Sequence, residues 1–317
     1  MGALHPQTQA VLDSLAAMKL TPPDQLPVEQ ARAQFMQSRA RFLAAPQPVG
    51  SIIDRSVPGP SGAIPLRIYR PDGSPPNALL PALVFMHGGG WVFGNLDSHD
   101  PMCRELCNLS GCALVSVDYR LAPEHKFPAA FDDTLAAIRY LASEGARLGI
   151  DGMRLAAGGD SAGGNLAAAA AIAFRDQGGP RLALQLLIYP VTDMTMDTPS
   201  YAAFADGYML TAQRMRYFRD CYLSAPSEAA DWRVSPLRAG DLSRLPPALI
   251  ITASHDPLVD EGRRYSERLT AAGVPATYTC YEGMVHGFMT MAGAIDDGRI
   301  AVRQAAAALK AALRGTS

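Results

Sequence analysis

The run Gly159-Asp160-Ser161-Ala162-Gly163 has the spacing of a nucleophilic serine on a sharp turn. In a G-x-S-x-G turn, a strand ends and a helix begins at the serine, so the hydroxyl projects above the sheet edge. The two glycines are required because larger side chains would collide there. The alternative is a glycine-rich turn in which Ser161 only caps a helix. An apolar run before Ser161 and an alanine-rich run after it favour a nucleophile for acyl transfer.

A second glycine run, His87-Gly88-Gly89-Gly90-Trp91, follows the apolar segment ALVFM. Glycines leave backbone N–H groups uncovered, so a substrate oxygen can approach them closely. We therefore interpret the run as an oxyanion-binding loop, with His87 bracing its first turn.

The rival interpretation of this loop is dinucleotide binding. Gly88, Gly90 and Gly94 follow a strand, and Asp118 ends the next strand, where a ribose-binding acid would lie. Trp91 crowds the loop, however, and residues 95–101 read as further loop rather than as a helix that starts on the glycines. The oxyanion interpretation is preferred.

A nucleophilic serine needs a base and an acid that orients it. Of six histidines, His286 lies just past the last predicted strand and is flanked by glycine, which leaves its ring room to reach inward. Asp256 directly follows the preceding strand, so both side chains arrive at the sheet edge that carries Ser161. Asp260 is the alternative acid, although it suits the first turn of a helix. The chain order Ser161, Asp256, His286 is that of an α/β-hydrolase.

Short apolar strands alternate with helical segments through most of the chain, which predicts an α/β fold with a mostly parallel sheet covered by helices on both faces. The predicted strands are 50–55, 63–70, 82–88, 112–119, 153–160, 183–190, 248–254 and 276–282. The predicted helices are 6–20, 28–45, 129–146, 161–176, 211–223, 258–272 and 294–314. Some 57 residues separate Pro190 from Ala248, too many for a simple crossover, so this stretch is predicted to be an inserted cap.

The composition favours a globular enzyme. The 317 residues are 48% hydrophobic and 18% charged, with 28 Lys plus Arg against 30 Asp plus Glu and a net charge of −2, so neither nucleic acid nor an anionic membrane is the expected partner. No membrane span or secretory signal is evident. The five cysteines lack framework spacing, and Cys103 and Cys107 have no second pair with which to bind a metal. A cytoplasmic location is therefore expected.

Six blocks together resemble the hormone-sensitive-lipase-like family of bacterial carboxylesterases, in its GDSAG branch. They are HGGGWVFG (87–94), SVDYRLAPEHKFPAA (116–130), GGDSAGGNLA (158–167), YPVTD (189–193), DPLVDEG (256–262) and HGF (286–288). Two positions depart from the usual pattern, Ser254 where relatives often have Glu and Val259 where Arg is frequent. Both bear on packing near Asp256 rather than on chemistry.

The resemblance implies an α/β-hydrolase fold with a helical cap, and it assigns roles. The nucleophile would be Ser161, the acid Asp256 and the base His286. The oxyanion donors would be the N–H groups of Gly89, Gly90 and Ala162, with loop support from Gly88 and His87. The cap would comprise residues 1–46 and 193–234, and the catalytic domain residues 47–192 and 235–317. Branch members often pair through the edge strand, here 276–282.

The expected function is hydrolysis of short- to medium-chain acyl esters through an acyl-enzyme, with no metal and no organic cofactor. Absence of a basic amphipathic stretch argues against action on lipid surfaces. The substrate pocket is predicted to be lined by the residues Phe35, Trp91, Phe204, Tyr208 and Leu210. Two alternatives remain: an amidase or peptidase with the same triad, and a non-catalytic small-molecule receptor on the same fold.

Overall fold

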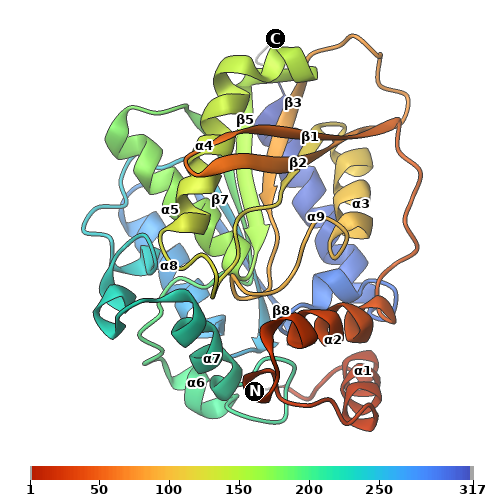
Figure 1. Ribbon diagram of the computed structural model, residues 1–317, viewed down its shortest axis with the longest axis vertical. Coiled ribbons are helices and arrows are strands. Elements are labelled where there is room, and N and C mark those ends of the chain that lie inside the picture. The colour runs from red at the N-terminus through yellow and green to blue at the C-terminus, as the bar shows by residue number, and fades with distance from the viewer. Residues whose placement is uncertain (1, 315–317) are drawn as a thin grey trace.

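The apolar runs of the sequence form the strands of one sheet (Figure 1). The computed structural model describes residues 2–314. The strands are β1 (Ser51–Gly59), β2 (Gly62–Arg70), β3 (Leu80–Met86), β4 (Ala113–Val117), β5 (Ile150–Asp160), β6 (Leu182–Ile188), β7 (Ala248–His255) and β8 (Ala276–Val285). Their order is β1-β2-β4-β3-β5-β6-β7-β8, and β2 is antiparallel to both of its neighbours while the pairs from β4 to β8 are parallel. The predicted α/β class with a mostly parallel sheet is confirmed.

Helices connect most of the strands. They are α1 (Pro6–Ala17), α2 (Val28–Ala40), α3 (Asp100–Ser110), α4 (Ala129–Glu144), α5 (Ala162–Gln177), α6 (Pro199–Ala203), α7 (Ala212–Tyr222), α8 (Val259–Ala271) and α9 (Asp296–Leu313). Short 3-10 helices lie at Pro23–Gln25, Gly145–Leu148, Pro226–Ala230, Pro236–Arg238 and Phe288–Met291. Within residues 2–314, no helix has the length and apolarity that a membrane crossing requires.

The sheet separates two hydrophobic cores. Helices α4, α5 and α8 pack on one face, where buried residues such as Leu141, Leu166 and Leu269 meet the sheet. Helices α3 and α9 pack on the other face through residues such as Leu106 and Val302 (Figure 1). Because helices bury both faces, the central strands have no polar side, which explains their continuous apolar runs.

Strand register determines which residues meet at the carboxyl ends of the strands. Met86, the last residue of β3, pairs with Gly159 of β5, so the glycine loop and the serine turn begin side by side. His255 of β7 likewise pairs with Val285 of β8. The residues that follow these two strands are Asp256 and His286, which therefore emerge side by side.

Two segments far apart in the sequence lie beyond these carboxyl ends. Helices α1 and α2 lie beside the inserted helices α6 and α7 at the lower end of the molecule in Figure 1. The Gln213 amide of α7 donates to the carboxylate of Asp24 over 3.0 Å, which joins the insertion to the N-terminal segment.

The sequence misplaced several boundaries. The first two helices end at Ala17 and Ala40 rather than at 20 and 45. Helix α3 starts at Asp100, inside the stretch 95–101 that the sequence pattern predicts to be a loop. Its second residue is proline, which the first turn of a helix tolerates because no hydrogen bond is lost there.

Candidate active site

Ser161 lies between β5 and α5 in a backbone conformation that few non-glycine residues adopt. Its φ is 56° and its ψ is −117°, a strained combination that the surrounding structure must enforce. The Ser161 N–H donates to the Ile188 carbonyl over 2.8 Å. A Cβ at Gly159 or Gly163 would collide with the backbone carbonyl of Met86. The two flanking glycines therefore permit β3 to approach the turn closely.

A chain of hydrogen bonds connects Ser161 to two side chains on neighbouring loops. His286 Nε2 lies 2.9 Å from Ser161 Oγ, and His286 Nδ1 lies 2.6 Å from Asp256 Oδ2. A carboxylate can only accept, so Nδ1–H donates to Asp256 and the Nε2 lone pair faces the serine hydroxyl. All three residues are buried. This arrangement allows the imidazole to take the serine proton while the carboxylate stabilises the resulting charge.

Asp260, the alternative acid, forms contacts away from His286. Asp260 Oδ2 accepts from the Ser200 N–H over 3.0 Å, and its other oxygen pairs with Arg263. Asp256 meanwhile accepts from the Leu258 N–H over 3.0 Å, which fixes the carboxylate that faces His286. The structure brings Asp256, and not Asp260, to the imidazole.

The glycine loop presents free backbone donors beside the serine. Gly89 and Gly90 have φ values of 121° and 62°, where only glycine is unstrained. Among residues 2–314, no group accepts a hydrogen bond from the N–H of Gly89, Gly90 or Ala162. All three amides are therefore available to an oxygen that bears negative charge.

Asp160, the residue before the serine, holds this loop. Its Oδ1 accepts from the Gly88 N–H over 2.7 Å and lies 3.0 Å from His99 Nε2. Burial alone would raise the pKa of Asp160, but the electrostatic interaction and hydrogen bond with the His99 imidazole and the hydrogen bond from the Gly88 amide together hold that pKa below its ordinary value. The sequence does not indicate this contact, because its pattern predicts a loop at His99.

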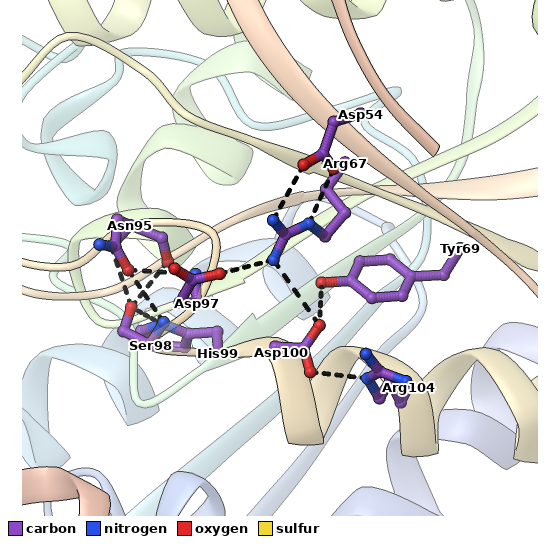
Figure 2. Close-up of polar contacts among 9 residues, drawn as sticks. All are labelled: Asp54, Arg67, Tyr69, Asn95, Asp97, Ser98, His99, Asp100 and Arg104. Atoms are coloured by element: carbon purple, nitrogen blue, oxygen red, sulfur yellow. Dashed lines mark hydrogen bonds and ion pairs between the residues drawn. The ribbon is translucent and has the colours of Figure 1, made fainter. Parts of the chain in front are cut away.

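His99 belongs to a polar network that runs from the buried Ser98 and His99 out to the exposed Asp54 and Asp97, shown in Figure 2. Its Nδ1 lies 2.8 Å from Ser98 Oγ, and Asn95 Oδ1 accepts from the Ser98 N–H over 2.9 Å. Arg67 of β2 bridges Asp54 of β1 and Asp97 over 2.8 and 2.7 Å. The first strands of the sheet thus support the start of α3, from which His99 reaches Asp160.

His87 braces the loop from the other side. Its Nδ1 lies 2.9 Å from the Gly88 carbonyl, and the Tyr119 hydroxyl donates to the His87 carbonyl over 2.6 Å while the two rings stack. Burial, followed by the electrostatic interaction with the neighbouring His99 imidazole, lowers the pKa of His87 to about 4. At neutral pH His87 is therefore an uncharged structural side chain.

A cavity of about 450 Å³ opens above Ser161 and His286. Three predicted pocket residues, Phe35, Tyr208 and Leu210, line it. The other two do not. Trp91 is fully buried behind the loop and stacks on Tyr222 with ring centroids 4.3 Å apart, and Phe204 packs under Tyr208 and against His255. Both are large aromatic residues in cap or loop segments, which the sequence alone could not divide between core and cavity wall.

The donor set does not suit a metal ion or a dinucleotide. In the part of the chain from residue 2 to 314, no three His, Cys, Asp or Glu side chains are arranged to hold a metal. The amide of Gly88, which a phosphate would need in the dinucleotide interpretation, already donates to the Asp160 carboxylate. An anion at that position would meet a like charge.

Comparison with known proteins gives consistent matches. A sequence model of the family described as alpha/beta hydrolase fold matches residues 83–290. The chain is 39% identical to ethyl acetate hydrolase of Pseudomonas putida, across 96% of this chain and 98% of that one. It is 40% identical to carboxylesterase NlhH of Mycobacterium tuberculosis, across 98% and 96%. The solved structure of a hyperthermophilic esterase from Pyrobaculum calidifontis matches with a TM-score of 0.93 at 43% identity, covering 98% of this chain and 99% of that one.

Proposed function

The chain belongs to the alpha/beta hydrolase fold family, in its hormone-sensitive-lipase-like branch, and is a carboxylic ester hydrolase; from that premise we propose that Ser161 hydrolyses short- to medium-chain acyl esters through an acyl-enzyme. The observation that carries this proposal is the hydrogen-bond chain from Ser161 Oγ through His286 to Asp256. Each member has the chemistry and the neighbour that its role requires.

In the first half-reaction, Ser161 Oγ attacks the ester carbonyl carbon while His286 Nε2 takes the hydroxyl proton. Asp256 orients the ring and stabilises the imidazolium. The carbonyl oxygen becomes an oxyanion, which the N–H groups of Gly89, Gly90 and Ala162 bind, each worth about 3 kcal/mol in the transition state. The carbon–oxygen bond to the alcohol then breaks, and His286 returns the proton to the leaving oxygen.

The second half-reaction releases the acid. A water molecule gives a proton to His286 and attacks the acyl carbon, and the oxyanion forms at the same three amides. Ser161 leaves with the proton that His286 returns, so the enzyme regains its starting state. No step requires a metal or an organic cofactor.

The residues that line the cavity support our proposal that the chain forms a cap and a catalytic domain. The cap would comprise residues 1–46 and 193–234, and the catalytic domain residues 47–192 and 235–317. Side chains from α2 and from the insertion, including Phe35, Leu210 and Phe218, line the cavity above Ser161. Their apolar surface favours an ester with an apolar acyl or alcohol group, and about 450 Å³ suits a short to medium chain.

Two further assignments extend the resemblance to partners and location. We place a second copy of the chain at β8, since this strand ends the sheet and its residues before Gly283 are exposed or half-buried. Light scattering over a concentration series tests the pairing. We also assign the protein to the reducing cytoplasm, in keeping with five cysteines that are all unpaired.

A titration with a serine-directed phosphonate tests the catalytic proposal. Intact mass and peptide mapping should find one adduct on Ser161, with a matching loss of hydrolysis of p-nitrophenyl butanoate. Parallel assays on the corresponding anilide distinguish an esterase from an amidase. Folded protein that neither reacts nor hydrolyses any ester would contradict the proposal and favour a receptor on the same fold.

A further inference from the structure

Two arginines, one from each capping segment, lie in the wall of the cavity that contains Ser161 and His286. Arg39 comes from α2 and Arg214 from α7, and both side chains are half-buried. Neither forms an ion pair with any carboxylate in residues 2–314; their hydrogen bonds go to the Thr290 hydroxyl and the Met209 carbonyl. Since each guanidinium carries five N–H donors, most of this donor capacity is unused.

Arg39 lies beside the loop of the proposed base. Its Nη1 donates to Thr290 Oγ1 over 3.1 Å, and Thr290 Oγ1 donates to the Gly287 carbonyl over 2.8 Å. A Cβ at Gly287 would lie only 2.8 Å from Arg39 Nη1, so the guanidinium packs against the residue that follows His286. Its Cζ also lies 5.1 Å from the centroid of the Phe35 ring, which fixes the plane of the group.

The charge in this cavity is not balanced. Burial lowers the pKa of both guanidiniums, and the charge of Arg39 lowers that of Arg214 further, yet arginine remains protonated in proteins. Lys19 adds a third cation to the wall. The one acidic side chain among the described lining residues is Asp160, which is already bound to Gly88 and His99. Desolvated cations without a counter-ion are unfavourable, and a bound anion would relieve the cost.

We propose that Arg39 and Arg214 bind a carboxylate of the substrate, so that the preferred esters carry a carboxylate near the ester group. The inference rests on the proposed role of Ser161 and His286. Planar guanidiniums suit a carboxylate because they can donate two parallel hydrogen bonds to it.

The position of Arg39 indicates which half of the ester carries the charge. His286 Nε2 returns a proton to the leaving oxygen, so the alcohol portion of the ester lies on the His286 side of the cavity. Arg39 is the cation next to that side, against Gly287. The substrate class is therefore an O-acyl hydroxy acid, whose hydrolysis releases a hydroxycarboxylate and a short carboxylic acid.

Matched neutral and anionic esters test the proposal. The carboxylate 3-acetoxybutanoate and its amide, 3-acetoxybutanamide, differ mainly in charge at the alcohol portion. We expect kcat/KM to be at least about tenfold higher for the carboxylate, as a charge-assisted hydrogen bond predicts. Monoethyl glutarate and ethyl glutaramate make the same comparison on the acyl side. Equal rates within both pairs would overturn the proposal, and a preference confined to the glutarate pair would overturn the assignment to the alcohol portion.

Substitutions of the two arginines then test which side chains bind the substrate carboxylate. Arg39→Met and Arg214→Met should each lower the carboxylate-to-amide ratio by about tenfold or more, and Arg39→Lys should retain part of it. Arg41→Met and Arg216→Met are the matched controls, because both residues are exposed and lie two positions away on or beside the same helices. Their ratio should equal that of the wild type. A ratio that falls equally in controls and test variants would contradict the assignment.

Turnover of p-nitrophenyl butanoate separates this inference from the proposed function. If the wild-type protein hydrolyses the neutral ester but shows no preference for a carboxylate, the esterase proposal stands and the carboxylate site is refuted. Protein that hydrolyses no ester refutes both. If an arginine variant does not fold, inhibition of the wild type provides the second measurement: 3-hydroxybutanoate should compete with the neutral ester more strongly than 3-hydroxybutanamide, and equal inhibition would count against the site.

Discussion

Asp160 Oδ1 accepts the Gly88 N–H over 2.7 Å, so the residue immediately before Ser161 holds the loop that faces it. One carboxylate thereby sets the distance between the serine hydroxyl and the free amides of Gly89 and Gly90. Because transition-state stabilisation depends on donors fixed before reaction, we expect this contact to matter for rate although Asp160 takes no part in proton transfer.

Replacement of Asp160 by Asn should reduce kcat by roughly 10- to 100-fold with little change in KM. The free energy of unfolding at pH 7 should fall by about 1–3 kcal/mol, since a buried charge-assisted hydrogen bond is weakened. The pKa of Asp160 is held below its ordinary value, so its contribution is present above about pH 4 and is lost at lower pH as the carboxylate is protonated. Wild type and variant should therefore converge in stability at acidic pH.

Asp97→Asn is the matched control for this experiment. Asp97 pairs with Arg67 in the network of Figure 2, but its side chain is 70% exposed. An exposed ion pair contributes at most about 1 kcal/mol, so kcat and stability should hardly change. Equal effects of both substitutions would contradict a specific role of Asp160 in positioning the loop.

The three members of the hydrogen-bond chain should differ in their effect on rate. Ser161→Ala and His286→Ala should each lower kcat by roughly a million-fold, and Asp256→Asn by less, because the nucleophile and base remain. Thermal unfolding should show that each variant is folded, and the exposed Ser143→Ala serves as a control with normal activity. A Ser161→Ala protein that kept a tenth of the wild-type rate would remove Ser161 from the mechanism.

Stability should depend on pH through His87. Its pKa is about 4 in the folded protein and about 6.5 in the unfolded chain. Between these values the unfolded chain binds a proton that the folded protein excludes, so the free energy of unfolding should fall by up to about 3 kcal/mol as pH drops from 6.5 to 4. Urea unfolding at several pH values measures the slope. His125→Gln changes an exposed histidine and should keep the slope, whereas His87→Asn should flatten it.

The cavity limits acyl chain length. With about 450 Å³ above Ser161, kcat/KM on p-nitrophenyl esters should peak at short to medium chains and decline toward hexadecanoate. Leu210→Ala should shift the optimum to longer chains, because a smaller apolar side chain in the wall enlarges the cavity. Leu109→Ala, an exposed residue on α3, is the control. An optimum at hexadecanoate in the wild type would contradict the predicted range.

Contacts that follow strand order could be predicted from the sequence, and those that depend on side-chain packing could not. Ser161, Asp256 and His286 each follow a strand, so parallel pairing alone brings them to one edge. The contact between His99 and Asp160 depends instead on where α3 begins, which the proline after Asp100 obscured. The prediction that Trp91 lines the cavity is wrong because it depends on backbone geometry that the sequence does not show. The φ of Trp91 is 60°, which turns its ring behind the loop and onto Tyr222.

The division of the cavity wall between α2 and α7 has a consequence for how specificity can change during evolution or engineering. Arg39 and Arg214 lie far apart in the sequence, and the contact between Gln213 of α7 and Asp24, just before α2, is one that joins their two segments. A chimaera that took only the N-terminal segment or only the insertion from a relative would combine half of one substrate-binding surface with half of another. Transfer of substrate preference should therefore require both segments to be exchanged together.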